Sequence, residues 1–312
     1  MGTGKIMNKT ILLLLLFSIL LLQSSPVQSS QIIIKSEEQF QFARQYLEKG
    51  EYLRAAWEFD RFIHFFPADE DVPKAQYLMG LCYLKGKKYE SARKVLEKVY
   101  KTHSDRPLGG KALFLMGESY YLQGVSAEAE RYFRMVVENY PSAELKNAAF
   151  YRLGWSRMGE DRWKEASEAF KMVEEKSPLY DSSQDLSTKS LKGETLPRKD
   201  PTSAGILAAV LPGLGHVYGE RYRDGLVSFI LNGLFIWAAV ESFDQDHDVL
   251  GGILTFLEAG WYSGNIYSAV NGAHKYNRKI RNEYRKDLPD RLDLNLFTTR
   301  DGHIGLAFKF DF

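Results

Sequence analysis

The sequence predicts a mainly α-helical protein: a solenoid of helical repeats, then a small helical membrane module, then a C-terminal β-hairpin. Three observations in the 312-residue chain support this prediction. Five columns of residues recur every 37 residues over residues 36–178, three apolar stretches follow within 204–273, and apolar residues alternate with polar ones at the end of the chain. Repeats of this length bury their apolar faces against neighbouring repeats, so the array is expected to stack.

Residues 1–29 are predicted to be an export signal. Lys5 and Lys9 precede an uncharged, apolar run over 11–22 with a single serine at position 18, and small residues follow at Val27 and Ser29. A basic start, a short apolar centre and small residues before the cleavage point are typical of secretory signals. A retained anchor is the alternative, although 12 residues is short for a bilayer span. In either case we expect the repeats to be exported.

The solenoid is expected over residues 30–178 in four units. Each unit has a small residue, a tyrosine or arginine three residues later, an alanine at twelve, and bulky apolar residues at sixteen and nineteen. The columns are Ala43, Gly80, Gly117 and Gly154; Tyr46, Tyr83, Tyr120 and Arg157; Ala55, Ala92, Ala129 and Ala166; Phe59, Leu96, Phe133 and Phe170; and Phe62, Val99, Val136 and Val173. Small residues let two helices cross closely, and the bulky positions fill the space between units.

This pattern resembles the tetratricopeptide repeat, whose usual period is 34 residues. The longer period here is similar to that of periplasmic bacterial members of the family. Two details depart from the pattern: Arg157 stands in the tyrosine column, and Ser104 stands where other units close with proline. The resemblance implies two antiparallel helices per unit and a concave groove that binds a protein or peptide.

An aromatic residue lies three positions before each small residue, and the resemblance implies that this column faces the groove. Arg44, Lys85 and Glu118 are expected nearby. Aromatic residues at helical spacing can be packing between successive first helices, or they can anchor a bound segment. We expect the partner-binding residues to be Phe40, Tyr77, Phe114, Tyr151, Trp155 and Tyr121.

A linker is predicted at 179–202, because residues 177–202 are rich in Ser, Asp, Lys and Pro and lack apolar periodicity. The membrane module is expected at 203–274. Its apolar stretches cover 204–218, 226–243 and 249–273, and the second is the clearest membrane span.

The start of the module resembles a short bacterial membrane domain with the signature Pro-Gly-x-Gly-Gln-x-Tyr, in which His216 replaces the usual glutamine. The matching residues are Pro212, Gly213, Gly215, His216, Tyr218 and Gly219. The resemblance implies membrane lipid as a partner. Glu258, His216, Asn232 and Asn265 are polar residues within apolar stretches. Such residues are candidates for ion or proton passage, or they hydrogen-bond between helices.

The distribution of charge bears on orientation. The loop 220–224 contains two arginines, and residues 275–291 contain seven Lys or Arg against three acids. If the repeats are periplasmic and all three stretches cross, both basic parts fall in the cytoplasm, as the positive-inside tendency requires. If the first stretch is re-entrant, the tail is instead periplasmic.

The final part, 275–312, is expected to be a basic segment and a β-hairpin. Apolar residues occupy every second position in 292–296 and 304–312 around an Asp-Gly turn. The terminal strand also resembles the closing strand of outer-membrane barrels, but two strands cannot close a barrel. We expect the hairpin to pack on the membrane module or on a partner.

No catalytic, metal or cofactor pattern is found. The six histidines are scattered, the single cysteine is Cys82, and a net charge of +1 offers no basis for nucleic-acid binding. No small-molecule substrate is evident, and an enzyme is not expected. The sequence therefore predicts a scaffold at the bacterial inner membrane with periplasmic repeats, acting in cell-envelope biogenesis. The alternatives are an accessory subunit of a small transporter or channel, and an assembly factor attached to the outer membrane.

Overall fold

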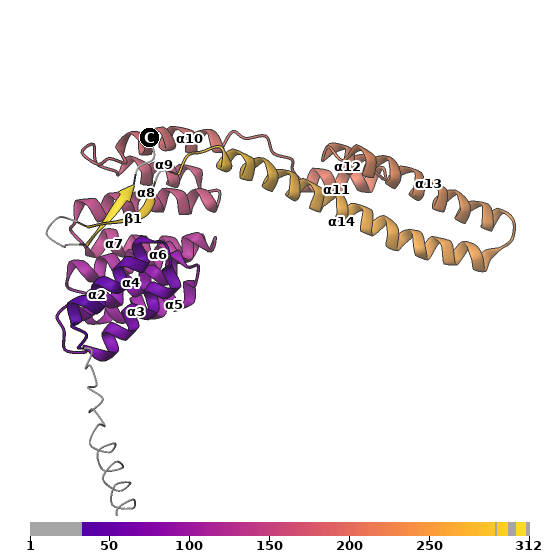
Figure 1. Cartoon of the computed structure of the whole chain (residues 1–312). Helices are drawn as coiled ribbons and strands as arrows, with labels where there is room; N and C mark the ends of the chain where they lie inside the picture. Colours follow the sequence, from indigo (N-terminus) through magenta and orange to yellow (C-terminus); the bar gives the residue numbers. More distant parts are fainter. Residues whose placement is uncertain (1–32, 291, 299–303, 310–312) are drawn as a thin grey trace, which may run out of the picture.

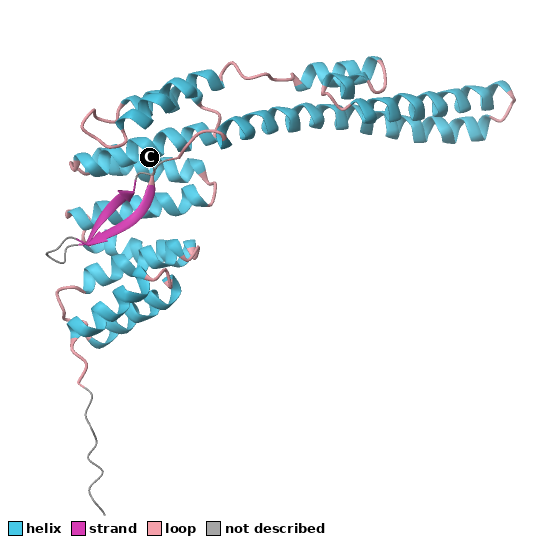
Figure 2. Ribbon diagram, turned by 45° about the horizontal axis from the view of Figure 1, so that its top comes forward, coloured by secondary structure: helices cyan, strands magenta, loops and turns pink. Residues whose placement is uncertain are grey.

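The computed structural model describes residues 33–290, 292–298 and 304–309. The predicted export signal lies outside these residues. Within them, a stack of helices at one end of the molecule is joined to a long helical hairpin (Figure 1). The stack runs across the axis of the hairpin in both views (Figures 1 and 2).

Residues 36–171 form four antiparallel helix pairs, which confirms the predicted helical solenoid. The pairs are α2 (Ser36–Glu48) with α3 (Tyr52–Phe65), α4 (Val72–Lys85) with α5 (Tyr89–Thr102), α6 (Pro107–Leu122) with α7 (Ser126–Asn139), and α8 (Ala143–Gly159) with α9 (Trp163–Lys171). The pairs are numbered here as units one to four.

Residues of the repeated columns meet at the point where the two helices of a unit cross. A Cβ atom on Gly154 would lie 2.6 Å from the ring of Phe170, and one on Gly117 would lie 2.7 Å from Phe133. Gly80 has the same relation to Leu96. Each small residue therefore makes room for the bulky residue sixteen positions later in its own unit.

Helix α10 (Tyr180–Gly193) replaces most of the predicted linker, which is a correction. The helix packs on α9 and closes the solenoid. Its buried face consists of small residues with a single leucine, namely Ser183, Leu186, Ser187, Ser190 and Gly193. A Cβ atom on Gly193 would overlap the ring of Trp163. Helix α10 needs no stripe of large apolar residues, because the large Trp163 side chain of α9 fills the space between the two helices.

The module contains α11 (Pro201–Val210), α12 (Leu214–Tyr218), α13 (Tyr222–Asp244) and α14 (Asp248–Lys286). Helix α11 has 10 residues and spans about 15 Å, half the thickness of a bilayer core. Helix α11 alone is therefore too short to cross a bilayer core. Among the described residues, α13 is the one helix long and apolar enough to cross a membrane.

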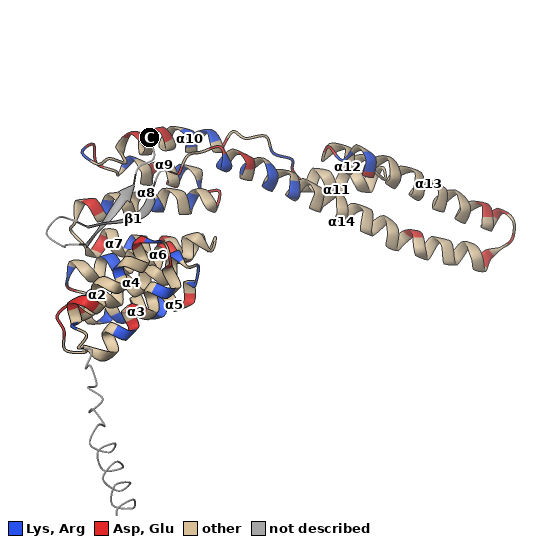
Figure 3. Cartoon of the chain, in the orientation of Figure 1, with Lys and Arg blue, Asp and Glu red and all other residues tan. Residues whose placement is uncertain are grey.

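Buried positions of the α13–α14 hairpin are small or polar and recur every seven residues. Those in the seven-residue register are Gly225, Asn232 and Ala239 on α13, and Gly251, Glu258, Asn265 and Gly272 on α14; Ser242, Ala269, Ala273 and Asn277 are buried outside it. The outward positions are large and apolar, with Phe229 52% exposed, Trp237 63% and Phe256 80%. Acidic residues gather at the tip of the hairpin and basic residues near its base (Figure 3).

The C-terminal end of α14 returns to the solenoid. Asp161, in the turn between α8 and α9, pairs with Arg281 at 2.8 Å and with Arg285 at 2.9 Å. Tyr284 packs edge-to-face on Trp163 and donates a hydrogen bond to the Lys189 carbonyl at 2.7 Å. The base of the hairpin and the last repeat are thus fastened together.

Two antiparallel strands follow, β1 (Asp293–Thr298) and β2 (Ile304–Lys309), with Asp293 paired to Lys309 and Thr298 to Ile304. The turn of the predicted hairpin lies outside the described residues. The strands run beside the repeats rather than along the membrane module (Figure 2).

Candidate partner-binding groove

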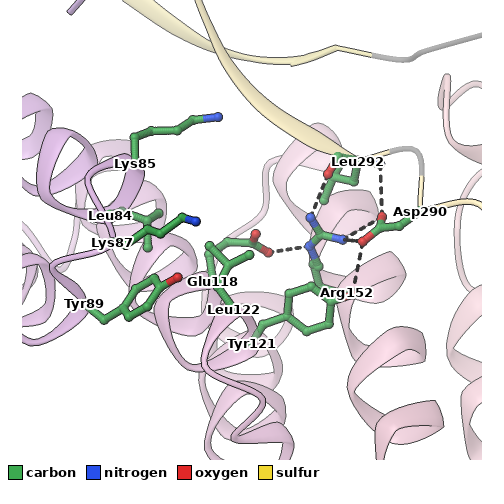
Figure 4. A pocket seen from close by; sticks show the side chains of 10 residues that line it. All are labelled: Leu84, Lys85, Lys87, Tyr89, Glu118, Tyr121, Leu122, Arg152, Asp290 and Leu292. Atoms are coloured by element: carbon green, nitrogen blue, oxygen red, sulfur yellow. Dashed lines mark hydrogen bonds and ion pairs between the residues drawn. The ribbon is translucent and has the colours of Figure 1, made fainter. Parts of the chain in front are cut away.

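The first helices of units two to four form a cavity of about 480 Å³ (Figure 4). Its lining comes from two distant parts of the chain. The repeats contribute Leu84, Lys85, Lys87, Tyr89, Glu118, Tyr121, Leu122 and Arg152, and the segment after α14 contributes Asp290 and Leu292. The cavity therefore lies between the repeats and the protein's own tail.

Arg152 is the centre of this site. Its Nη1 donates to both carboxylate oxygens of Asp290, at 2.9 and 2.8 Å, and its Nη2 donates to the carbonyl oxygen of Leu292 at 2.7 Å. The remaining guanidinium donor, Nε, bonds Glu118 at 2.5 Å. A planar guanidinium suits this arrangement, because it offers donors in fixed directions to a carboxylate and a carbonyl together.

Tyr121 completes the site. Its ring lies under the Arg152 guanidinium, 4.6 Å from the centroid, and its hydroxyl donates to Asp290 at 3.1 Å. Leu292 and Leu288 are buried, with 4% and 8% of their surfaces exposed. The Asp290 carboxylate also accepts a hydrogen bond from the Leu292 amide at 3.2 Å, within its own segment. The repeats thus hold a carboxylate, a backbone carbonyl and apolar side chains of one non-helical segment.

The electrostatics keep Arg152 charged. Burial opposes the charged form, but Glu118 and Asp290 overcome that effect and raise the pKa of Arg152. Burial raises the pKa of Glu118, while Arg152 opposes the rise. Burial is also the main cause of the raised pKa of the Tyr121 hydroxyl. The hydroxyl therefore remains a hydrogen-bond donor at neutral pH.

The predicted row of partner-binding aromatics is corrected by the structure. Phe40, Tyr77, Phe114 and Tyr151 are at most 4% exposed. Three of them pack edge-to-face or tilted on the second helix of their own unit: Phe40 on Phe59, Phe114 on Phe133 and Tyr151 on Phe170. A large ring at this position is needed to fill the unit, so the packing alternative describes these four residues.

The other two predicted groove residues differ in their placement. Trp155 is 8% exposed and packs on Phe170. Tyr121 lines the cavity, as do Lys85 and Glu118, which were expected nearby. Arg44 is buried in unit one and pairs with Glu48. Residues beside the aromatic column, such as Lys85, Glu118 and Tyr121, therefore line the groove, whereas the aromatic column itself does not.

Arg152 itself was missed, although the sequence contains a signal for it. It occupies the position two before the small residue, where the earlier units have Gln41, Leu78 and Leu115. A charged residue in a largely apolar column needs a partner if the column is buried. Its partner Asp290 lies 138 residues away and has no periodicity that would identify it.

The predicted module residues form a close junction of short helices. Gly213 has a φ of 91° and touches the Gly225 carbonyl, so this turn requires glycine. Gly215 allows contact with Ala208 and Ala269, and the Tyr218 hydroxyl accepts from the Asp200 amide at 2.9 Å. Gly219 ends α12, and Pro212 precedes the turn.

A second cavity, of about 410 Å³, lies inside the module. Its lining is His216, Ser228, Gly260, Trp261, Gly264, Asn265 and Ser268. Glu258 is buried outside this lining, and neither of its carboxylate oxygens has a hydrogen-bond partner among the described residues. No cluster of three potential metal ligands occurs in the part of the chain that the structure describes.

One protein-family model matches the repeats, and two solved structures are similar over parts of the chain. The tetratricopeptide repeat family model matches residues 74–105, 111–143 and 148–179, which correspond to units two to four. No curated protein matches the chain. A tetratricopeptide repeat protein from Parabacteroides merdae is 16% identical and covers 80% of this chain and 97% of its own, with a TM-score of 0.42. The repeats assigned to a kinesin light chain of Podosopora anserina are 18% identical and cover 51% of this chain and 86% of their own, with a TM-score of 0.43. Residues 74–179 therefore contain three segments that match the tetratricopeptide repeat, a repeat typical of protein-interaction scaffolds.

Proposed function

We propose that this protein is an exported, membrane-anchored scaffold whose groove holds an extended segment of a protein partner during cell-envelope biogenesis. The observation that carries the proposal is the Arg152 site. Three of its hydrogen bonds reach a carboxylate and a backbone carbonyl of the segment after α14. Peptide recognition requires such donors together with apolar pockets, and Leu84 and Leu122 also line the cavity.

The surface of the α13–α14 hairpin supports membrane anchoring. Large apolar side chains point outward while small and polar residues are buried, the reverse of a water-soluble helical hairpin. Helices in lipid pack through small residues and polar contacts in this way. In the proposal, α13 crosses the bilayer, and α14 crosses beside it because its polar residues Glu258 and Asn265 are buried rather than facing lipid. Lipid covers the outer faces of both helices.

The predicted signal at residues 1–29 supports export, with the repeats in the periplasm and the module in the inner membrane. The basic residues near the base of the hairpin would then be periplasmic, against the positive-inside tendency. That tendency applies to short loops, whereas long domains are translocated largely regardless of charge. The signal therefore decides the orientation in this proposal.

In-cell photocrosslinking tests the scaffold function. A photoreactive phenylalanine replaces Tyr89 or Leu122, which line the cavity, and Trp57 serves as the control because it is 65% exposed on α3, away from the site. We expect a defined envelope protein to be captured from Tyr89 and Leu122 but not from Trp57. Capture that is equal at all three positions, or absent, would contradict the proposal.

A transport function is the second candidate, and the buried Glu258 carboxylate favours it. Ionisable residues inside membrane segments are costly and are commonly part of ion or proton pathways. Substitution Glu258→Gln, with and without His216→Gln, separates the two functions. Loss of function in cells while capture from Tyr89 persists would favour transport, and retained function would favour the scaffold.

A further inference from the structure

The segment after α14 lies in the groove where a partner would bind. Asp290 accepts hydrogen bonds from Arg152 and Tyr121, and the Leu292 carbonyl accepts one from Arg152. This segment is outside the repeats in sequence, and it is held by polar contacts of the kind used for peptide ligands.

The site is built without the tail. Glu118, only 1% exposed, holds the Nε edge of Arg152 from the neighbouring unit, and the Tyr121 ring supports its face. Departure of the tail would leave the Nη donors of Arg152 directed at an open cavity. A preorganised site of this kind binds ligands at low ordering cost.

The tail is also delivered to the site at high local concentration. Arg281 and Arg285 hold the last turns of α14 to Asp161, and Arg285 bonds the Met158 carbonyl at 2.7 Å. Only residues 287–289 separate α14 from Asp290. Short tethers give effective concentrations on the order of millimolar, so even a weakly binding tail occupies the site in most molecules.

We propose that Leu288, Asp290 and Leu292 form a built-in competing ligand, and that the groove accepts partner segments of the same chemistry: a peptide with an acidic residue two positions before a leucine. This inference rests on the proposed function and adds the class of the partner and its regulation. The tail closes the site in the resting protein, and a partner must displace it. The apparent affinity for the partner is then reduced by the fraction of molecules with the tail in place.

The test uses the full chain in nonionic detergent and a fluorescent peptide of residues 286–298 as the probe. Substitution Asp290→Ala weakens the tail without changing the repeats. Asp287→Ala is the matched control, because Asp287 is also an acid of this segment but does not line the cavity. We expect Asp290→Ala to bind the peptide at least about tenfold more tightly than the wild type or Asp287→Ala, measured by fluorescence anisotropy.

A second arm checks that the peptide binds at Arg152. A peptide with asparagine in place of its Asp290 should bind the Asp290→Ala protein at least about tenfold more weakly than the original peptide does. Adding Tyr121→Phe, which removes only a hydroxyl, should weaken the original peptide severalfold and leave folding intact. Two results would overturn the inference. One is equal peptide affinity of the wild type, Asp290→Ala and Asp287→Ala; the other is equal affinity of the original and the asparagine peptides for the Asp290→Ala protein.

Crosslinking separates this inference from the proposed function. Capture from Tyr89 should increase in Asp290→Ala cells relative to Asp287→Ala cells. Equal capture in both, together with equal peptide affinities, would refute the competing tail and leave the scaffold standing. Tail-dependent peptide binding with no protein captured in either strain would support the tail device and refute the scaffold.

Discussion

Arg157 stands where the first three units have a tyrosine, and its contacts account for the departure. The guanidinium reaches Glu130 of the preceding unit at 3.2 Å and the Glu165 carbonyl at 3.1 Å. Glu130 also accepts hydrogen bonds from Arg134 and Arg162. One carboxylate therefore joins α7 to α8 and to the start of α9, a contact that the tyrosine column does not make.

Glu130 makes stability depend on pH. Burial alone would raise the pKa of Glu130, but hydrogen bonds from Arg134, Arg162 and Arg157 lower it below its usual value. A lowered pKa adds stability above the unfolded value of about 4.3, and that stability is lost as the pH falls through the folded pKa. We expect Glu130→Gln to reduce stability at pH 7 by about 1.5–3 kcal/mol.

Thermal unfolding followed by circular dichroism from pH 7 to pH 3 measures this effect. The gap between wild type and Glu130→Gln should shrink as the pH approaches 3. Glu128→Gln is the control, because Glu128 pairs with Arg131 at a largely exposed position. A gap that stays constant with pH would show that the ion pairs do not account for it.

The glycine column makes a steric prediction. A side chain on Gly154 would overlap the Phe170 ring, so Gly154→Val should cost about 1–3 kcal/mol through overpacking. Lys98→Val, at an exposed position of α5, is the control and should change stability by less than about 1 kcal/mol. Equal melting temperatures of the two variants would mean that the crossing tolerates a larger side chain.

At the scale of elements, long-range self-similarity made the repeats predictable. Four units repeat the same packing problem, so the columns show which residues meet. Helix α10 was missed because serines and a glycine form its buried face against Trp163. The tail site was missed because Arg152 and Asp290 are 138 residues apart and form a single, unrepeated contact.

The junction of α14 with the repeats depends on Asp161. Asp161 has a φ of 62°, which asparagine also tolerates, so Asp161→Asn removes the charge and preserves the turn. We expect faster hydrogen exchange of residues 278–286 in this variant, because Arg281 and Arg285 lose their ion pairs. Asp185→Asn, which breaks the Lys189 pair on α10, is the control and should leave that exchange unchanged.

At the scale of the whole molecule, the fastening of α14 places the repeats and the tail on one side of any membrane that the hairpin crosses. The arrangement with three crossings would separate them, and α11 is too short for it. We therefore expect the re-entrant alternative, in which the first apolar stretch does not cross.

Topology reporters test this expectation. Alkaline phosphatase, active only after export, is fused after residue 312 or inserted at residue 246 in the hairpin tip. On the proposed orientation, the C-terminal fusion should be active and the tip insertion inactive. The reverse result would place the repeats in the cytoplasm, and equal activity would show that the hairpin does not cross.

Helix α14 is continuous over 39 residues, a length of about 58 Å. In the proposed arrangement, the basic residues 275–286 emerge from the bilayer and form a stiff spacer of about 18 Å. The solenoid extends sideways from the end of that spacer (Figure 1). A segment seated on Arg152 would therefore be kept at a set height above the lipid surface, so this protein would select partners by their reach as well as by their chemistry.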